Sequence, residues 1–428
     1  MKNLLILHLE SITRQRLAAF GSSFPNTRRL MQDALVFDNF FSSATSTLMV
    51  VTYLFHGNDF EFDAASEFEG MRPAMNNRNL FSILQSRGYN ADLICLNAFH
   101  AANPTKLASW SDDLPPLWGT NDFPSLLDRF DKLTDTPPFA IYVWDLITHI
   151  EHSLALAPFS NGLTDQIRRA CGVADDAVGV MLATLERKGQ LDNTTIVIYG
   201  EHGDDYWTHG FKGGMVHATE PYTQIRGTPL AIRDPCLTLG TNENLASTID
   251  IAPTCLALLG IDESTVFPHT GTNLLASSPE LVYSQNFTAN QPDNRNLGIV
   301  KAFAVTDDTY NLLVSSRGLE LYAYHLDPGN HCNLLHFFDI MPEGRLVLRE
   351  RPGVAGHFRM ALKDNPRAVA NLVSHFETLR AALAERVAAK RAYIVERGVE
   401  PAFALDPRCL HTTADEARAA FFRPTECV

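Results

Sequence analysis

Short apolar segments alternate with amphipathic helical segments over residues 1–290, and this alternation limits the fold more than any other feature of the sequence. The apolar segments have the length of buried strands and occupy residues 3–8, 91–96, 139–144, 194–199 and 229–232. Helical patterns lie between them, at residues 26–33, 79–86 and 164–187. Strands that alternate with helices predict an α/β fold with a mostly parallel central sheet sandwiched by helices.

The pattern changes near residue 290. Strand-like segments at residues 299–306, 311–314 and 319–325 follow one another without intervening helices, and a long helical pattern comes next at residues 366–396. We therefore expect a catalytic α/β domain over residues 1–290. A C-terminal subdomain over residues 291–428 would contain a small antiparallel sheet, a long helix and a tail.

Carboxylates and histidines follow three of the strand-like segments. They are Glu10 after the first, Asp145 and His149 after the third, and Glu201 and His202 after the fourth. The carboxyl ends of parallel strands meet at one edge of a sheet, where reactive groups gather. Because carboxylates and imidazoles are common ligands of divalent metals, the pattern predicts a metal site at this edge.

Each of these residues also has a plainer explanation. A carboxylate just after a strand often caps the next helix, and a lone histidine is more often packed or solvated than bound to a metal. Capping does not explain a carboxylate–histidine pair followed at once by glycine, as in Glu201-His202-Gly203. The convergence of several such residues therefore favours the metal site.

The segment from Glu10 to Gly57 resembles the N-terminal signature of the alkaline-phosphatase/sulfatase superfamily. The matching positions after Glu10 are Gly21, Pro25-Asn26, Leu30, Phe37-Asp38-Asn39, Thr47 and Gly57. Further matches are Gly88-Tyr89, Glu201-His202-Gly203, Pro253-Thr254 and Glu320-Leu321-Tyr322. The resemblance covers about residues 1–335, and it is far more specific for the superfamily than for the reaction.

The resemblance implies that Glu10, Thr47, Glu201 and His202 share one divalent metal ion, with Thr47 as the nucleophile. The family usually has Asp-His-Gly where this chain has Glu201-His202-Gly203. The longer side chain of Glu201 could alter the position of the metal or the preference for it. We expect one or two ions, with Zn²⁺ or Mn²⁺ ahead of Ca²⁺.

A second metal is a separate question. Asp145 and His149 resemble the Asp-x-x-x-His pair that holds a second ion in the phosphodiesterase and phosphomutase branches, and His217 is spaced like the third ligand of that site. In the sulfatase and phosphoethanolamine-transferase branches, the corresponding histidines contact the substrate or leaving group without a metal. Both interpretations stay open.

The threonine nucleophile bears on the reaction. Metal coordination lowers the pKa of a hydroxyl and makes it nucleophilic. Sulfatases place Cys or Ser here, followed by a Pro and an Arg that direct its oxidation, whereas this chain continues Thr47-Leu48-Met49.

The segment around Glu10 resembles lipoteichoic-acid synthases and phosphoethanolamine transferases, which use threonine. Their pattern would instead make Thr45 the nucleophile. We favour Thr47 because both of its flanks match the sulfatase spacing.

Three further residues are candidates for substrate binding. His209 occupies a position that often carries the same residue in the family, and His100 and Lys212 could bind an anion. Each of the last two is also explained as a solvated side chain.

Composition restricts the partners. The chain has 49 acidic against 35 basic residues, which disfavours a nucleic-acid or anionic-membrane surface. The seven cysteines have no CxxC spacing, and neither a signal peptide nor a membrane span is evident. We expect a cytoplasmic protein whose substrate is a small-molecule or glycan-linked phosphate ester; the oligomeric state is left open.

The predicted function is that of a metal-dependent phosphodiesterase or phospho-group transferase. A sulfatase-like or phosphomonoester hydrolase of the same fold is the first alternative. A catalytically inactive sulfatase-fold binding protein is an alternative of another class. The complete set of Glu10, Thr47, Glu201 and His202 favours an enzyme.

Overall fold

The chain forms two compact units, each discontinuous in sequence. The first comprises Met1–Ser43, Thr47–Asp204 and Arg226–Pro279, and the second comprises Ala44–Ser46, Asp205–Ile225 and Glu280–Val428. The computed structural model describes residues 1–59, 78–96, 114–149, 162–205, 208–209, 217–262, 269–286, 302–315, 318–396, 405 and 407–411.

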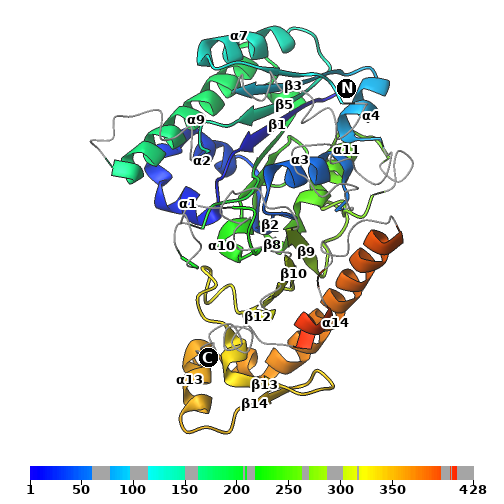
Figure 1. Ribbon diagram of the computed structural model, residues 1–428. Helices are drawn as coiled ribbons and strands as arrows, with labels where there is room; N and C mark the ends of the chain where they lie inside the picture. The colour runs from blue at the N-terminus through cyan, green and yellow to red at the C-terminus, as the bar shows by residue number, and fades with distance from the viewer. Residues whose placement is uncertain are drawn as a thin grey trace, which may run out of the picture. The chain divides into compact units, whose positions relative to one another are not determined.

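The first unit is built on an eight-stranded sheet with the order β4-β3-β5-β1-β6-β7-β2-β8 (Figure 1). Its strands are β1 (Asn3–Leu9), β2 (Leu35–Phe41), β3 (Asn90–Leu96), β4 (Leu117–Gly119), β5 (Phe139–Asp145), β6 (Thr194–Gly200), β7 (Leu230–Arg233) and β8 (Gly240–Ser247). Strand β7 runs antiparallel to both of its neighbours, and the other pairs are parallel. The predicted mostly parallel α/β sheet is confirmed.

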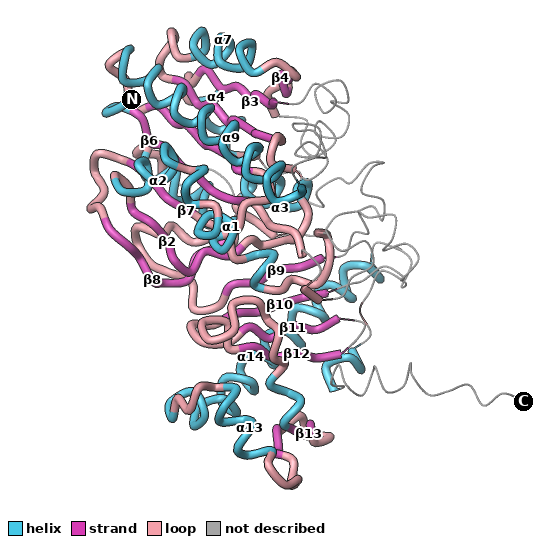
Figure 2. The backbone as a smooth tube through the Cα atoms, turned by 90° about the vertical axis from the view of Figure 1, so that its left-hand side faces the viewer, coloured by secondary structure: helices cyan, strands magenta, loops and turns pink. Residues whose placement is uncertain are grey.

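Helices cover both faces of this sheet. They are α1 (Arg14–Ala19), α2 (Pro25–Gln32), α3 (Thr47–His56), α4 (Leu80–Ser86), α7 (Phe123–Leu133), α9 (Gly162–Arg187) and α11 (Ile251–Leu258). Helix α9 packs beside α2 and α7, whereas α3 packs beside α4 and α11 (Figures 1 and 2). Strands β1, β5 and β6 are buried along their whole length, which explains why they are almost continuously apolar instead of alternating.

The second unit contains a four-stranded antiparallel sheet with the order β12-β11-β10-β9. The strands of this sheet are β9 (Val282–Asn286), β10 (Ala302–Thr306), β11 (Asn311–Ser315) and β12 (Gly318–Tyr322). The unit also contains a two-stranded sheet of β13 (Phe338–Ile340) and β14 (Leu346–Leu348), and the helices α13 (Val354–Ala361) and α14 (Pro366–Glu396). Side chains of α14, such as Leu372 and Phe376, are buried in one apolar cluster with Leu312 and Leu321 of the sheet. The predicted smaller antiparallel sheet with a long helix is thus also confirmed.

The remaining short helices connect these elements. They are α10 (Thr223–Arg226), η1 (Gly21–Ser23), η3 (Leu191–Asn193), η4 (Thr248–Asp250), η6 (Leu334–Phe337) and η8 (Pro407–His411). Within the described residues, no helix combines the length and the apolar character that crossing a membrane requires.

Candidate active site

The register of three neighbouring strands brings the predicted acids together. On β1, Leu9 lies opposite Asp145 of β5 on one side and Gly200 of β6 on the other. Glu10 and Glu201 are the next residues of their strands, so they leave the sheet side by side at the carboxyl edge. The structure therefore assembles at one edge the groups that the sequence placed after separate strands.

The loop after β1 passes very close to the end of β6. A Cβ atom on Gly200 would lie 2.0 Å from the carbonyl oxygen of Ile12 and 2.8 Å from Cδ of Pro229, so only glycine fits there. Ser11 adopts a left-handed conformation with φ of 54°, which is uncommon for a residue with a side chain. The buried Arg16 donates from Nη1 to the Ser11 carbonyl oxygen at 2.8 Å and fixes the loop. This close approach holds Glu10 against Glu201.

Thr47 is the first residue of α3 and contacts both members of the Glu201-His202 pair. Its Oγ1 donates to Glu201 Oε1 at 3.1 Å and lies 3.1 Å from Nε2 of His202. The remaining separation, from His202 Nε2 to Glu201 Oε1, is 3.2 Å. These three atoms form a nearly equilateral triangle. Its edges match the separation of roughly 3 Å expected between ligands that bind one ion at about 2.1 Å.

Glu10 lies beside Glu201, close enough for the two carboxyl groups to interact. Its side chain is fully buried, and its Oε2 accepts a hydrogen bond of 2.8 Å from Nε1 of Trp144. Burial, and then the neighbouring Glu201 charge, raises the pKa of Glu10 to about 8. Burial likewise raises the pKa of Glu201 to about 7.

The donor set fits a divalent cation. Two buried carboxylates that stand side by side resist ionisation together, and a cation between them relieves both the repulsion and the loss of hydration. Oε2 of Glu201 has no hydrogen-bond partner among the described residues. Carboxylate oxygens and imidazole nitrogens are common ligands of divalent cations. Among the described residues, His8, Glu10 and Glu201 lie close enough together to bind one, and Thr47 and His202 contact Glu201.

Asp145 and His149 lie at the same edge. Asp145 ends β5, is 6% exposed, and accepts a hydrogen bond of 2.9 Å at Oδ1 from the backbone of Ile147. Burial raises the pKa of Asp145 to about 7, and the Glu10 charge adds to this shift. His149 is close enough for its charge to lower the pKa of Glu10. The pair is therefore placed to interact with the Glu10 group, and whether it binds an ion or a substrate stays a prediction.

The remaining predicted residues belong to the second unit or lie outside the described residues. Thr45 belongs to the second unit, where its buried hydroxyl donates to the carbonyl oxygen of Thr219 at 3.0 Å. His217, also in the second unit, is 4% exposed. His100 and Lys212 lie outside the described residues. Within the first unit, Thr47 is thus grouped with Glu201 and His202, and the choice between Thr47 and Thr45 as nucleophile stays a prediction.

His209, a predicted substrate contact, has several partners within the second unit. Within the second unit its Nδ1 pairs with Asp205, and its Nε2 lies 3.1 Å from the carbonyl oxygen of Asn330. The ring also stacks on Tyr222, with centroids 3.7 Å apart. Both ring nitrogens are thus engaged within the second unit, and a substrate contact of His209 stays a prediction.

Four residues near the acids were missed by the sequence analysis. They are His8, Tyr142, Trp144 and Tyr199, on the three central strands. A usable signal existed, because residues two apart on a strand face the same side, so His8 faces as Glu10 does. The alternation was hidden since both faces of these strands are buried.

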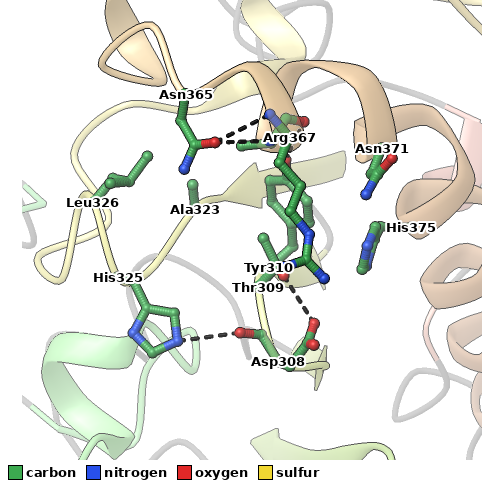
Figure 3. A pocket seen from close by; sticks show the side chains of 11 residues that line it. Asp308, Thr309, Tyr310, Ala323, His325, Leu326, Asn365, Arg367, Asn371 and His375 are labelled. Atoms are coloured by element: carbon green, nitrogen blue, oxygen red, sulfur yellow. Dashed lines mark hydrogen bonds between the residues drawn. The ribbon is translucent and has the colours of Figure 1, made fainter.

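The second unit contains a separate polar cavity of about 320 Å³ at the start of α14 (Figure 3). Asp307, Asp308 and His375 beside it lie close enough together to bind an ion. Their contacts have a structural explanation, however. Asp307 accepts hydrogen bonds from the backbone of Thr309 and Tyr310 in the β10–β11 turn and from His375 Nδ1 at 2.5 Å, which ties the turn to α14.

Comparison with known proteins places the chain in a family. The family model described as Sulfatase matches residues 2–261. An arylsulfatase of Volvox carteri is 27% identical over 199 residues, which is 39% of this chain and 30% of the relative. Lipoteichoic acid synthase 1 of Bacillus subtilis (strain 168) is 28% identical over 178 residues, covering 39% of this chain and 28% of the relative. The chain thus spans less than a third of the length of either relative.

Solved structures share the fold. A 2-O GAG sulfatase superposes with a TM-score of 0.65 at 16% identity, over 96% of both chains. The phosphonate monoester hydrolase of Agrobacterium radiobacter has a TM-score of 0.57 at 16% identity, over 82% of this chain and 100% of the other. A protein in the alkaline phosphatase superfamily from Vibrio parahaemolyticus has a TM-score of 0.56 at 14% identity, over 88% of both chains. The chain therefore belongs to the sulfatase family.

Proposed function

We propose that this sulfatase-family protein cleaves or transfers a phosphate ester, preferably a diester, with Thr47 as the nucleophile. The observation that carries the proposal is the position of the Thr47 hydroxyl oxygen, 3.1 Å from both Glu201 Oε1 and His202 Nε2. The substrate would be a small-molecule or glycan-linked phosphate ester.

The nucleophile favours phosphate over sulfate. Position 47 is a threonine and not the Cys or Ser that resemblance to sulfatases would require. It is followed by Leu48 and Met49, without the Pro and Arg of that motif. Among the relatives, the lipoteichoic acid synthase is named for a phosphate-containing polymer, and the phosphonate monoester hydrolase for a phosphorus ester. A sulfate ester is the second candidate, because the arylsulfatase and the 2-O GAG sulfatase are also similar to this chain.

The residues of the site would have distinct roles in the proposed reaction. A bound divalent cation would supply positive charge that lowers the pKa of a coordinated hydroxyl and neutralises the transferred group. The Thr47 hydroxyl donates a hydrogen bond to Glu201 Oε1, so Glu201 would accept the hydroxyl proton when Thr47 attacks. Oγ1 of Thr47 then forms the bond to phosphorus while the bond to the leaving alcohol breaks. Water or an acceptor alcohol releases the group from Thr47.

Metal number, ligands and cellular location complete the proposal. Glu10, Thr47, Glu201 and His202 would hold one ion, Zn²⁺ or Mn²⁺ ahead of Ca²⁺. Asp145 and His149 would hold a second ion or contact the substrate, and His217 remains a predicted partner of that pair. A cytoplasmic location stays a prediction from the sequence.

Turnover of three aryl esters tests this function. Protein freed of metal and resupplied with Mn²⁺, Zn²⁺ or Ca²⁺ is assayed with a phosphate diester, a phosphate monoester and a sulfate ester. The wild type should cleave the diester, and Thr47→Ala should lose at least about 10⁴-fold in kcat, as for other nucleophiles. Thr45→Ala is the matched control and should retain most of the activity.

Other outcomes would redirect the assignment. Turnover of the sulfate ester alone would support the sulfatase alternative. Activity that survives in Thr47→Ala and disappears in Thr45→Ala would move the nucleophile to Thr45. Metal binding without turnover of any ester would support the inactive binding protein.

A further inference from the structure

The cavity of about 320 Å³ at the start of α14 is lined entirely by residues of the second unit, none of which has a role in the proposed reaction (Figure 3). Its volume is near the lower end of the range of roughly 300–1,000 Å³ that is usual for small-molecule sites. The apolar part of its lining consists of Tyr310, Ala323, Leu326 and Ala368. The cavity therefore has the size and the partly apolar lining of a site for a small ligand.

Two opposite charges line this cavity without pairing with each other. Arg367 comes from the first turn of α14, and Asp308 comes from the turn between β10 and β11. Figure 3 shows the Arg367 side chain extending from the helix towards that turn. Among the described residues, the Arg367 guanidinium has no hydrogen bond or ion pair, and the Asp308 carboxylate accepts only the Thr309 hydroxyl, at 2.8 Å. Both charges can therefore be matched by a ligand.

The neighbouring acid is already used by the fold. Asp307 accepts hydrogen bonds from the backbone of its own turn and from His375. Asp308 is thus the carboxylate that remains for a ligand. A single carboxylate suits an ammonium group better than a hard divalent cation, which takes several oxygen ligands.

Two amide side chains add polar groups beside Arg367. Asn365 accepts at Oδ1 from the backbone N–H groups of Arg367 at 3.1 Å and Ala368 at 3.2 Å, so its NH₂ group is left as a donor. Asn371 lies four residues after Arg367, on the same face of α14, and its side chain has no hydrogen-bond partner among the described residues. Both amides can assist Arg367 in binding an anionic group.

A ligand that matches this lining carries a carboxylate for Arg367 and an ammonium group for Asp308. The planar guanidinium matches a carboxylate with two parallel hydrogen bonds, and hydrogen bonds between charged groups are the strong ones. A free α-amino acid has both groups on one carbon atom. A simple anion or amine would leave one of the two charges in the cavity unmatched.

We propose that this cavity binds a free α-amino acid with an apolar side chain. Arg367 holds the carboxylate, Asp308 holds the ammonium group, and the side chain contacts Tyr310, Leu326 and the two alanines. The site is independent of the proposed ester cleavage, because it uses neither Thr47 nor a metal ion.

Three matched ligands test the recognition of both charges. L-leucine is compared with 4-methylpentanoate, which lacks the amine, and with 3-methylbutylamine, which lacks the carboxylate, by calorimetric titration of the full chain. L-leucine should bind. Each of the other two should bind about 10–100-fold more weakly, because each loses the hydrogen bonds of one charged group.

Substitutions should separate the ligands by charge. Arg367→Ala should weaken the binding of L-leucine and 4-methylpentanoate about 10–100-fold and leave the amine unaffected. Asp308→Ala should weaken the binding of L-leucine and the amine and leave the acid unaffected. Both side chains are exposed, so the variants should fold, which thermal unfolding checks. Arg391→Ala, which removes an exposed arginine of the same helix outside the cavity, should bind all three as the wild type does.

NMR of alanine methyl groups locates the ligand without any effect on the charges. In protein with ¹³C-labelled alanine methyl groups, L-leucine should shift the signals of Ala323 and Ala368, which line the cavity. The signal of Ala140, buried in β5 of the first unit, should not move.

Several results would overturn the proposal. A wild type that does not bind L-leucine, or binds it without shifting Ala323 and Ala368, would show that the cavity takes no amino acid. Equal affinity for L-leucine and either single-charge ligand would show that one charge is not recognised. Unchanged affinity for L-leucine in Arg367→Ala would remove the carboxylate partner. Shifts of the same two signals by Ca²⁺ and not by L-leucine would make the cavity a cation site.

Discussion

At the scale of single residues, the site depends on how two buried carboxylates are kept apart and oriented. Glu10 Oε2 accepts a hydrogen bond from the Trp144 N–H, and Glu201 Oε1 accepts one from the Thr47 hydroxyl. A buried carboxylate is stabilised in its charged form by each donor it accepts from. The donors around Glu10 and Glu201 therefore influence the pKa of both carboxyl groups, and hence how readily a metal ion could replace their protons.

The indole donor provides a direct prediction. Trp144→Phe keeps the aromatic packing and removes the hydrogen bond to Glu10, which is worth about 1.5–3 kcal/mol when one partner is charged. We expect metal affinity to fall about 10–100-fold, as measured by chelator competition. Trp118→Phe on β4 is the control, because Trp118 contacts Arg129 and not the acids. Equal affinity in Trp144→Phe and the wild type would show that this hydrogen bond does not tune Glu10.

The two threonines show where sequence reasoning at the residue scale reached its limit. Thr45 and Thr47 lie in one Ser/Thr-rich stretch, and either could be aligned with a nucleophile of the family. In the structure α3 begins at Thr47, whereas Ala44–Ser46 belong to the second unit, where Ala44 pairs with Gln285. Such long-range pairing leaves no local signal in the sequence.

At the scale of elements, the site is made by the ends of β1 and β6 and by the start of α3. The strands and the positions of Glu10, Asp145 and Glu201 at their ends could be predicted from apolar runs and the residues that follow them. The antiparallel direction of β7 could not, because a short apolar run has no direction. The contacts among His8, Tyr142 and Tyr199 were also hidden, since they depend on the register between strands.

The close approach at the end of β6 gives a prediction for that element. Gly200→Ala would place a methyl group 2.0 Å from the Ile12 carbonyl oxygen, so the loop that holds Glu10 must move. We expect the free energy of unfolding to fall by at least about 1–3 kcal/mol. We also expect metal binding to weaken. Denaturant unfolding and chelator competition measure the two effects.

Gly172→Ala is the matched control for that substitution. Gly172 lies within α9, where a Cβ atom would meet nothing within 4 Å. Alanine is the better helix former, so the control should be neutral or stabilising by up to about 1 kcal/mol. If Gly200→Ala behaved like Gly172→Ala, the close packing of the β1 loop over β6 would be contradicted.

At the scale of the whole molecule, the buried acids link stability to pH. The pKa is raised to about 8 for Glu10 and to about 7 for Glu201 and Asp145, so the folded protein binds more protons than the unfolded chain at neutral pH. Stability must then fall as the pH rises through these values. Burial lowers the pKa of His8 and His56 to about 4, and this acts in the opposite direction only below the ordinary histidine value of 6.5.

The metal-free protein should therefore lose thermal stability between about pH 6.5 and pH 8. Bound Mn²⁺ or Zn²⁺ should remove most of this dependence, because the ion stabilises the charged carboxylates in place of protons. Thermal unfolding at several pH values, with and without the ion, measures both effects. Glu10→Gln should flatten the slope of the metal-free protein. A melting temperature that rises over this interval would contradict the raised pKa values.

The central claim is that Thr47, held by Glu201 and His202, receives the group that is transferred. The most direct measurement is peptide mass spectrometry of metal-loaded protein quenched in acid during turnover of the phosphate diester, beside Thr47→Ala. The account predicts one retained phosphate-containing group on Thr47 and none on the corresponding peptide of the variant. A group found on Thr45 or on any other residue, or the same modification in Thr47→Ala, would contradict it.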